Sequence, residues 1–175
     1  MQKLLVVIIF ILGLALCGIL VLIGFAPSID HAAGLAHPTF GGMRIGGDGA
    51  ARIEPIKALA FTFQILVLAQ FACFIALGVR VNRRSPTFYT LLSGCFLLTA
   101  LVWWQLFSGH QNYLASGETQ YILGFPAATA WLIYGIWLSG MSFVALYVVG
   151  FKHYVWSDQN EKDFQKLVQD HQHDL

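Results

Sequence analysis

The charged residues of this 175-residue chain are confined to the segments that separate four long apolar stretches. All ten lysines and arginines and all nine aspartates and glutamates lie outside these stretches, which cover residues 4–26, 58–79, 85–117 and 119–151. A helix needs about 20 apolar residues to cross about 30 Å of hydrocarbon, and a charge near the bilayer centre costs at least about 2.5 kcal/mol. The pattern predicts four spanning segments, over about 4–26, 58–79, 87–108 and 127–151.

These segments are expected to be helices, because lipid offers no partners for backbone N–H and C=O groups. Barrel strands are shorter, about 10 residues, and alternate in polarity. We therefore expect an all-α integral membrane protein whose spans form a four-helix bundle over residues 1–151, followed by a tail over residues 152–175. A cleaved signal peptide is the alternative for the first span. Its apolar run exceeds the roughly 7–15 residues of a signal core, so we interpret it as retained.

The basic residues predict an orientation, since lysine and arginine collect in cytoplasmic loops. In a four-span protein, three of them lie together in the loop over residues 27–57, and the other seven lie on the opposite side. Both termini are therefore predicted to be cytoplasmic, in a multi-pass protein of the inner (plasma) membrane. The seven residues on the predicted cytoplasmic side are Lys3, Arg80, Arg83, Arg84, Lys152, Lys162 and Lys166.

The tail changes in character after the fourth span. Ser157 and Asp158 are good N-cap residues, and Asp158 with Glu161 resembles a capping box. Apolar residues then recur at helical spacing. This pattern predicts a short amphipathic helix on the cytoplasmic side, with an apolar face formed by Phe164, Leu167 and Val168.

Composition narrows the class of protein further. Hydrophobic residues make up 57% of the chain and charged residues 11%, whereas a soluble domain has about 25% charged residues. So few charges could not cover a water-facing surface, which excludes a soluble enzyme, a disordered chain and a nucleic-acid binder with a basic patch. The lipid bilayer is the expected environment, and a net charge of +1 indicates no strongly charged partner.

The spans hold few groups that could carry chemistry. They contain no acidic residue and no histidine, and the three cysteines form no Cys-x-x-Cys pair. We therefore predict no catalytic residue, no metal site and no cofactor. The most polar residues within the spans are glutamines, which we expect either to bond neighbouring helices or to line a polar cavity. They are Gln64, Gln70 and Gln105.

A quinone or haem edge is the alternative at the outer end of the third span. Trp103, Trp104 and His110 would shape it. A haem would need a second histidine, which His31 or His37 in the first outer loop could supply.

Small residues four positions apart mark close helix packing. The second span has Ala69-x-x-x-Cys73 and Ala72-x-x-x-Ala76, and the fourth has Gly135-x-x-x-Ser139 with Gly140 beside it. These faces serve either packing inside the bundle or docking on another membrane subunit.

The fourth span begins with Gly124-Phe125-Pro126, where glycine allows a sharp turn and proline suits the first helical turn. Together with Gly135, Tyr147 and Asp158, this entrance resembles the small accessory subunits of sodium:solute symporters, over residues 88–163. The resemblance implies a bacterial inner-membrane protein without catalytic residues that accompanies a large transporter. Such subunits usually have two spans, whereas this chain has four, and the resemblance assigns no binding residues.

Three hypotheses follow from these patterns. The first is a non-catalytic membrane subunit, an accessory component of a transporter complex with a larger membrane protein as its partner. The alternative is a membrane anchor subunit of a quinone- or haem-linked respiratory oxidoreductase. The third is a stand-alone carrier or enzyme for a lipid-like substrate.

Overall fold

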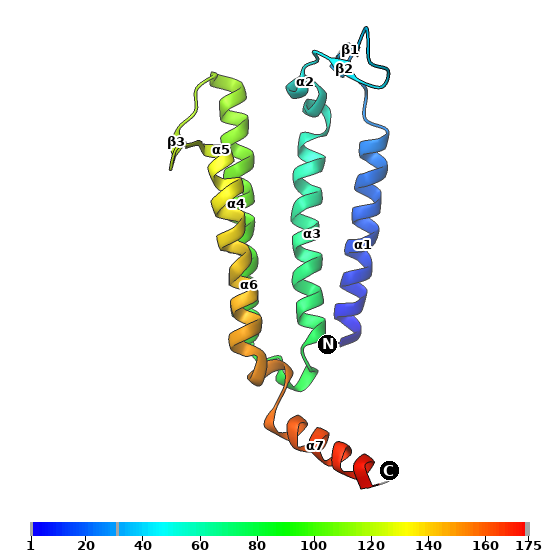
Figure 1. The fold of residues 1–175 in the computed structure, drawn as a ribbon, viewed down its shortest axis with the longest axis vertical. Helices are drawn as coiled ribbons and strands as arrows, with labels where there is room; N and C mark the ends of the chain where they lie inside the picture. The colour runs from blue at the N-terminus through cyan, green and yellow to red at the C-terminus, as the bar shows by residue number, and fades with distance from the viewer. Residues whose placement is uncertain (1, 31, 174–175) are drawn as a thin grey trace.

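The computed structural model describes residues 2–30 and 32–173, and long helices dominate it (Figure 1). Four helical segments are long and apolar enough to cross a membrane: Gln2–Gly24, Gly49–Gly78, Pro86–Ser116 and Ala127–Val155. Each contains or overlaps one of the four predicted spans. The structure therefore confirms an all-α protein with four long apolar helices.

The segments divide into shorter elements. The first is α1 (Gln2–Gly24); the second joins α2 (Gly49–Ile53), the 3₁₀ turn η1 (Glu54–Ile56) and α3 (Lys57–Gly78). The third is α4 (Pro86–Ser116), which follows the 3₁₀ turn η2 (Val81–Arg83). The fourth joins α5 (Ala127–Ala130), the π-helical turn η3 (Trp131–Gly135), α6 (Ile136–Gly150) and a second π-helical turn, η4 (Phe151–Val155).

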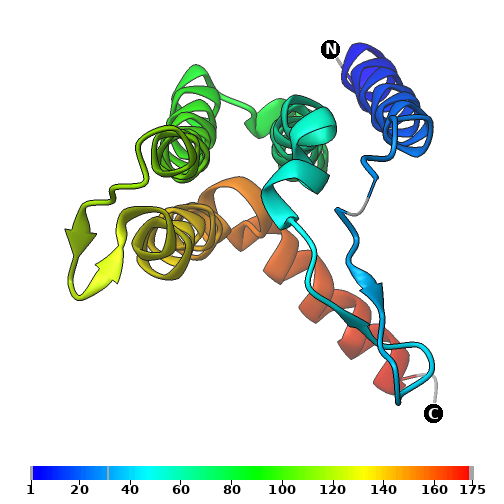
Figure 2. The same cartoon turned by 90° about the horizontal axis from the view of Figure 1, so that it is seen from above.

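The long helices form a row rather than a closed ring. The closely packed pairs are α1 with α3, α3 with α4, and α4 with α6. Figure 2 shows α1, α3 and α4 side by side, with α6 against one side of α4. The predicted four-helix bundle is thus open in this structure, and much of the surface of each helix is not covered by the other helices.

The core lies where the α3–α4 turn meets the end of the fourth segment. Phe88 is 1% exposed, and its ring lies 5.0 Å from that of Tyr154. Further along, Phe71 of α3 meets Phe143 of α6 with ring centroids 5.4 Å apart. The other buried core residues are Leu68, Ala76, Val79 and Leu92. This small core connects three of the four long segments.

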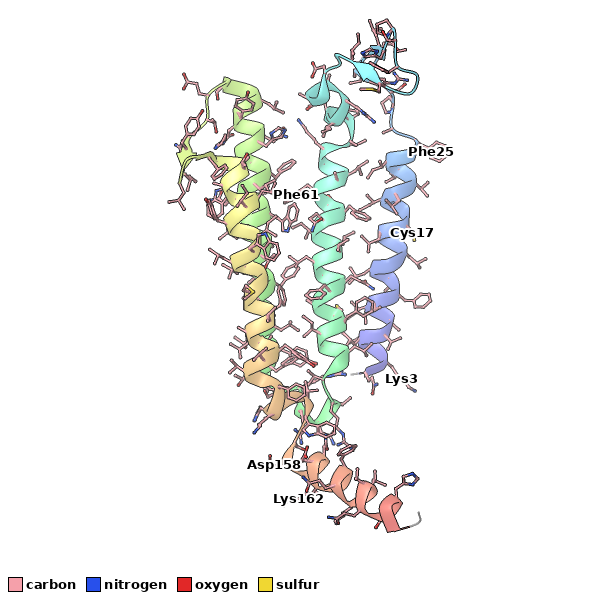
Figure 3. All side chains as sticks on the ribbon, viewed as in Figure 1. Lys3, Cys17, Phe25, Phe61, Asp158 and Lys162 are labelled. Atoms are coloured by element: carbon pink, nitrogen blue, oxygen red, sulfur yellow. The ribbon has the colours of Figure 1, made fainter. Side chains whose placement is uncertain are left out.

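The two ends of the molecule differ. The N-terminal end of α1, the α3–α4 turn and α7 (Asp158–His173) share one end, here called the α7 end (Figure 1). Lys3 and Lys162 both lie toward it, whereas Phe25 lies at the opposite end (Figure 3). That opposite end, here called the hairpin end, carries two short antiparallel hairpins. They pair β1 (Leu35–Ala36) with β2 (Arg44–Ile45) and β3 (Tyr121–Ile122) with β4 (Phe125–Pro126).

A helix occupies the tail, where the sequence predicts one. Ser157 rather than Asp158 caps it, because the Ser157 hydroxyl accepts a bond from the Asn160 N–H at 3.2 Å. The indole N–H of Trp156 donates to Glu161 at 2.8 Å and fixes the direction in which α7 leaves the fourth segment. The apolar side chains of α7 are exposed, so the apolar face of this amphipathic helix is not covered by the described residues. These side chains are Phe164, Leu167 and Val168.

Candidate functional site

The small-residue face of α3 lies inside the protein. Ala76 is buried, and Ala69, Ala72 and Cys73 are partly buried. All four line a groove of about 280 Å³ between α1 and α4, whose other walls include Leu5. The internal packing between α1, α3 and α4 therefore uses this face, and the small side chains let the helices approach closely.

The small residues of the fourth segment lie in two different surroundings, the interior of the protein and its outer surface. A Cβ on Gly135 would approach Val102 Cγ1 and Trp131 Cε3 to 2.8 Å, so only glycine fits where α4 crosses. Ser139 is 2% exposed, and its hydroxyl donates to the Ile136 carbonyl at 3.2 Å. Gly140, in contrast, has nothing within 4 Å of where its Cβ would be. Gly135 and Ser139 thus serve internal packing, and Gly140 faces outward.

The entrance to the fourth segment is a hairpin turn. Leu123 and Gly124 link β3 to β4 with φ of 50° and 83°, the left-handed pair that a two-residue type I′ turn requires. Pro126 then precedes α5 as its N-cap, and the Ala127 N–H donates back to the Gln120 carbonyl at 2.8 Å. Gly124 and Pro126 therefore lie in the hairpin through which the chain enters the helix, with Pro126 as the N-cap rather than in the first helical turn.

The three glutamines lie in different surroundings. Gln64 and Gln70 lie partly buried on α3, whereas Gln105 is exposed on α4. Gln70 Oε1 is buried without a hydrogen-bond partner among the described residues. A bond between neighbouring helices, which the sequence suggested for these residues, is not made by Gln70 Oε1 here.

The aromatic residues near the hairpin end form a cluster between α3 and α4. The Phe61 ring lies 5.9 Å from that of Trp104 and 4.7 Å from that of Phe107 (Figure 3). Trp103 is partly buried and His110 is exposed. His37 turns inward within its own loop, where Nδ1 accepts the Thr39 and Phe40 N–H groups, both at 3.1 Å. His31 lies outside the described residues.

The described residues contain no group of three or more His, Cys, Asp or Glu side chains that could hold a metal ion. The candidates for the quinone or haem edge in the described part of the chain are the aromatic cluster, the exposed His110 and His37, whose Nδ1 is already bonded within its loop. The cluster packs α3 against α4, which is a structural role.

A basic cluster at the α7 end was not singled out from the sequence. Arg84 is buried, and its side chain donates to two carbonyls at the end of α3: Nε to Val79 at 2.8 Å and Nη2 to Leu77 at 3.3 Å. Arg83 Nη1 donates to the His153 carbonyl at 3.2 Å. The α3–α4 turn is thereby tied both to α3 and to the end of the fourth segment. The sequence signal for this cluster is the adjacent pair Arg83 and Arg84, which in the sequence indicates only orientation.

The same region is hollowed on both sides of Tyr154. One apolar hollow of about 400 Å³ lies between α3 and the fourth segment and includes Phe74, Val79 and Tyr154. A second, of about 480 Å³, runs between α4 and α6 and includes Leu91 and Tyr154. A Cβ on Gly150 would approach Tyr154 Cδ2 to 2.6 Å, so glycine lets the ring lie flat against the helix between the two hollows.

No protein-family model matches the chain, and no curated protein or solved structure matches it either.

Proposed function

We propose that the chain is a non-catalytic subunit of a larger membrane complex, an accessory component of a transporter in the inner membrane, with the α7 end in the cytoplasm. The resemblance of residues 88–163 to accessory subunits of sodium:solute symporters suggests the class of partner. The partner would carry the ion and substrate sites.

The open row of helices is the observation that supports this proposal most. In the most apolar window of each spanning segment, at most 17% of the residues are buried by the rest of the chain. A path for a polar solute must be enclosed by helices and lined by polar or ionisable groups. The row encloses little interior, and residues 4–26, 58–79, 87–108 and 127–151 include no Lys, Arg, Asp or Glu. A larger partner that supplies the path fits both features.

The outward face of α6 is the docking surface that we assign to this partner. Gly140 lies there with open space around it, and its neighbours Trp137, Leu138 and Met141 are 75%, 73% and 57% exposed. A glycine between large apolar side chains forms a notch into which a partner helix could pack closely.

The test is purification of the full chain from its native membranes in mild detergent, with and without Gly140→Leu. We expect the unchanged chain to elute in a hetero-complex with one larger transporter, and G140L to lose most of that transporter. G140L should fold normally, because no described residue beyond the adjacent helix backbone lies within 4 Å of the new Cβ.

Gly94→Leu is the matched control. Gly94 lies exposed on α4 and also has nothing within 4 Å of its Cβ position, so the substitution adds the same bulk elsewhere. A stable lone monomer with its own transport activity would contradict the proposal. Equal transporter recovery with G140L and G94L would contradict the assignment of the α6 face, and a haem absorption band in the pure chain would favour the oxidoreductase anchor instead.

A further inference from the structure

A polar hollow of about 410 Å³ opens at the α7 end, between the α3–α4 turn and η4. Three of its side chains carry fixed positive charge, and none is a carboxylate. In the described part of the chain the ion pair found is Lys57 with Glu54, so no carboxylate neutralises these three cations. The hollow is lined by Asn82, Arg83, Arg84, Ser85, Lys152 and His153.

Arg84 is the most telling of these residues. It is 7% exposed, and Nη1 is buried without any hydrogen-bond partner among the described residues. The carbonyls of Leu77 and Val79 satisfy Nε and one bond of Nη2, but they supply only partial negative charge. A buried guanidinium that lacks an anion is costly, and buried charges in proteins are normally paired. Arg84 therefore places a buried positive charge beside the hollow, and no carboxylate in the described part of the chain pairs with it.

The start of α4 adds to the attraction for an anion. Ser85 lines the hollow and caps the helix, with its hydroxyl accepting the Phe88 N–H at 3.2 Å. A helix N-terminus carries partial positive charge, which favours phosphate, although Pro86 has no N–H and the Phe88 N–H is bonded to Ser85. An arginine fork and a lysine ammonium are likewise the groups that proteins use to bind phosphate oxygens.

An apolar groove leads away from this hollow. The hollow between α4 and α6 shares His153 with the polar hollow and extends along α6 to Ser142. At a rise of 1.5 Å per residue, the segment between these two residues is about 16 Å long, about half of the roughly 30 Å hydrocarbon core. The groove therefore has the length of one lipid leaflet, with the cations at its headgroup end.

We propose that the α7 end binds one anionic phospholipid, with its phosphate in the polar hollow and an acyl chain in the groove between α4 and α6. Basic pockets between membrane helices recognise acidic headgroups in this way. A zwitterionic lipid is disfavoured, because its ammonium group would sit near Arg83, Arg84 and Lys152. The proposal does not depend on the partner protein described above.

The test uses the full chain, purified in mild detergent, stripped of lipid and examined by native mass spectrometry. We expect one molecule of added phosphatidylglycerol to be retained, with phosphatidylcholine retained at least tenfold less. Lys152→Gln should lower phosphatidylglycerol affinity about fivefold, and Arg83→Gln with Lys152→Gln about twentyfold or more. The Lys152 side chain is exposed and makes no hydrogen bond in the described structure, so its replacement leaves the fold intact.

Arg80→Gln is the control for charge. Arg80 is exposed in the same turn and does not line the hollow, so R80Q removes one positive charge without touching the site. We expect R80Q to retain phosphatidylglycerol as the unchanged chain does.

A second pair of variants tests the acyl chain. Ala145 is exposed and lines the groove, so Ala145→Phe should fill the groove and lower phosphatidylglycerol retention several-fold. Val148 lies on the same helix and is 64% exposed but does not line the groove, so Val148→Phe should have no effect. Millimolar inorganic phosphate should compete only weakly, because it lacks the acyl chain.

Three results would overturn the proposal. The first is equal retention of the two lipids. The second is a response of K152Q that matches that of R80Q. The third is full displacement of phosphatidylglycerol by inorganic phosphate, together with normal phosphatidylglycerol binding by A145F. That result would indicate a site for a soluble anion.

Discussion

The ring of Tyr154 folds back over Gly150, one helical turn earlier, where a Cβ would come within 2.6 Å of Tyr154 Cδ2. On its other side the ring meets Phe88 at 5.0 Å. The two contacts fix Tyr154 in the small core that joins α3, α4 and the fourth segment. The π-helical turn η4 places the tyrosine there, because the Trp156 N–H bonds the Phe151 carbonyl at 2.9 Å, five residues back.

Gly150→Ala should therefore displace the Tyr154 ring from the core. We expect a loss of about 1–3 kcal/mol in the free energy of unfolding, the usual cost of overpacking a buried site. Unfolding in detergent, followed by circular dichroism, measures it. Gly94→Ala is the control, because its Cβ would meet nothing within 4 Å. Unfolding of G150A at the same midpoint as G94A would show that Tyr154 is free to move.

Gly135→Ala tests the crossing of α4 and the fourth segment. The new methyl group would approach Val102 Cγ1 and Trp131 Cε3 to 2.8 Å, and we expect destabilisation of about 1–3 kcal/mol. Gly140→Ala, on the same segment, meets nothing and should be neutral or stabilising by up to about 1 kcal/mol, because alanine favours helix. The same unfolding measurement compares the two variants, and equal midpoints would contradict the close crossing.

Arg84→Gln tests the tie between the α3–α4 turn and α3. The variant loses charged hydrogen bonds to the Val79 and Leu77 carbonyls, which are worth about 1.5–3 kcal/mol each at most in net stability. Relief of the unpaired charge offsets part of this, so we expect a net loss of about 1–3 kcal/mol in thermal unfolding experiments. Arg80→Gln, in the same turn, should change stability by less than about 0.5 kcal/mol. An R84Q protein as stable as R80Q would mean that α3 ends without this cap.

Gly34→Ala tests the first hairpin. Gly34 has φ of 76°, and a Cβ there would come within 2.5 Å of the Gly46 carbonyl oxygen. We expect the loop to open locally, with faster hydrogen exchange at the Asp48 N–H, which bonds the Ala32 carbonyl at 3.1 Å. The spans should keep their stability. Gly41→Ala serves as the control, since Gly41 has ordinary backbone geometry and open space; equal exchange in both variants would contradict the close crossing of the hairpin.

The four long helices could be predicted because one strong rule decides them: charge is excluded from lipid. The same rule gives no information about how helices pack. Gly135 could be found from its spacing, because close helix contacts need small residues, but the spacing does not tell Gly135, which packs inside, from Gly140, which faces outward. That distinction depends on the rotation of the helix, and the π-helical turn η3, which ends at Gly135, changes the rotation of the segment ahead of both glycines.

Other features of the structure depend on contacts that the sequence pattern does not predict. Tyr154 is 8% exposed in the core, although it follows directly after the fourth predicted span. In the first loop, Gly34 and Gly47 allow two backbone segments to cross too closely for any side chain. Both features depend on contacts between segments apart in the chain or on a local π-helical turn. A hydropathy pattern predicts neither such contacts nor such a turn.

The row of helices leaves α1 outside the core that joins the other three long segments. α1 packs mainly on α3, and the core that joins α3, α4 and the fourth segment takes one partly buried residue from it, Leu5. If α1 swung away within the bilayer, this core would survive. The groove lined by Ala69, Ala72, Cys73 and Ala76 would lose one wall and become accessible from the lipid. The first helix therefore covers the α3 face where another helix could pack most closely.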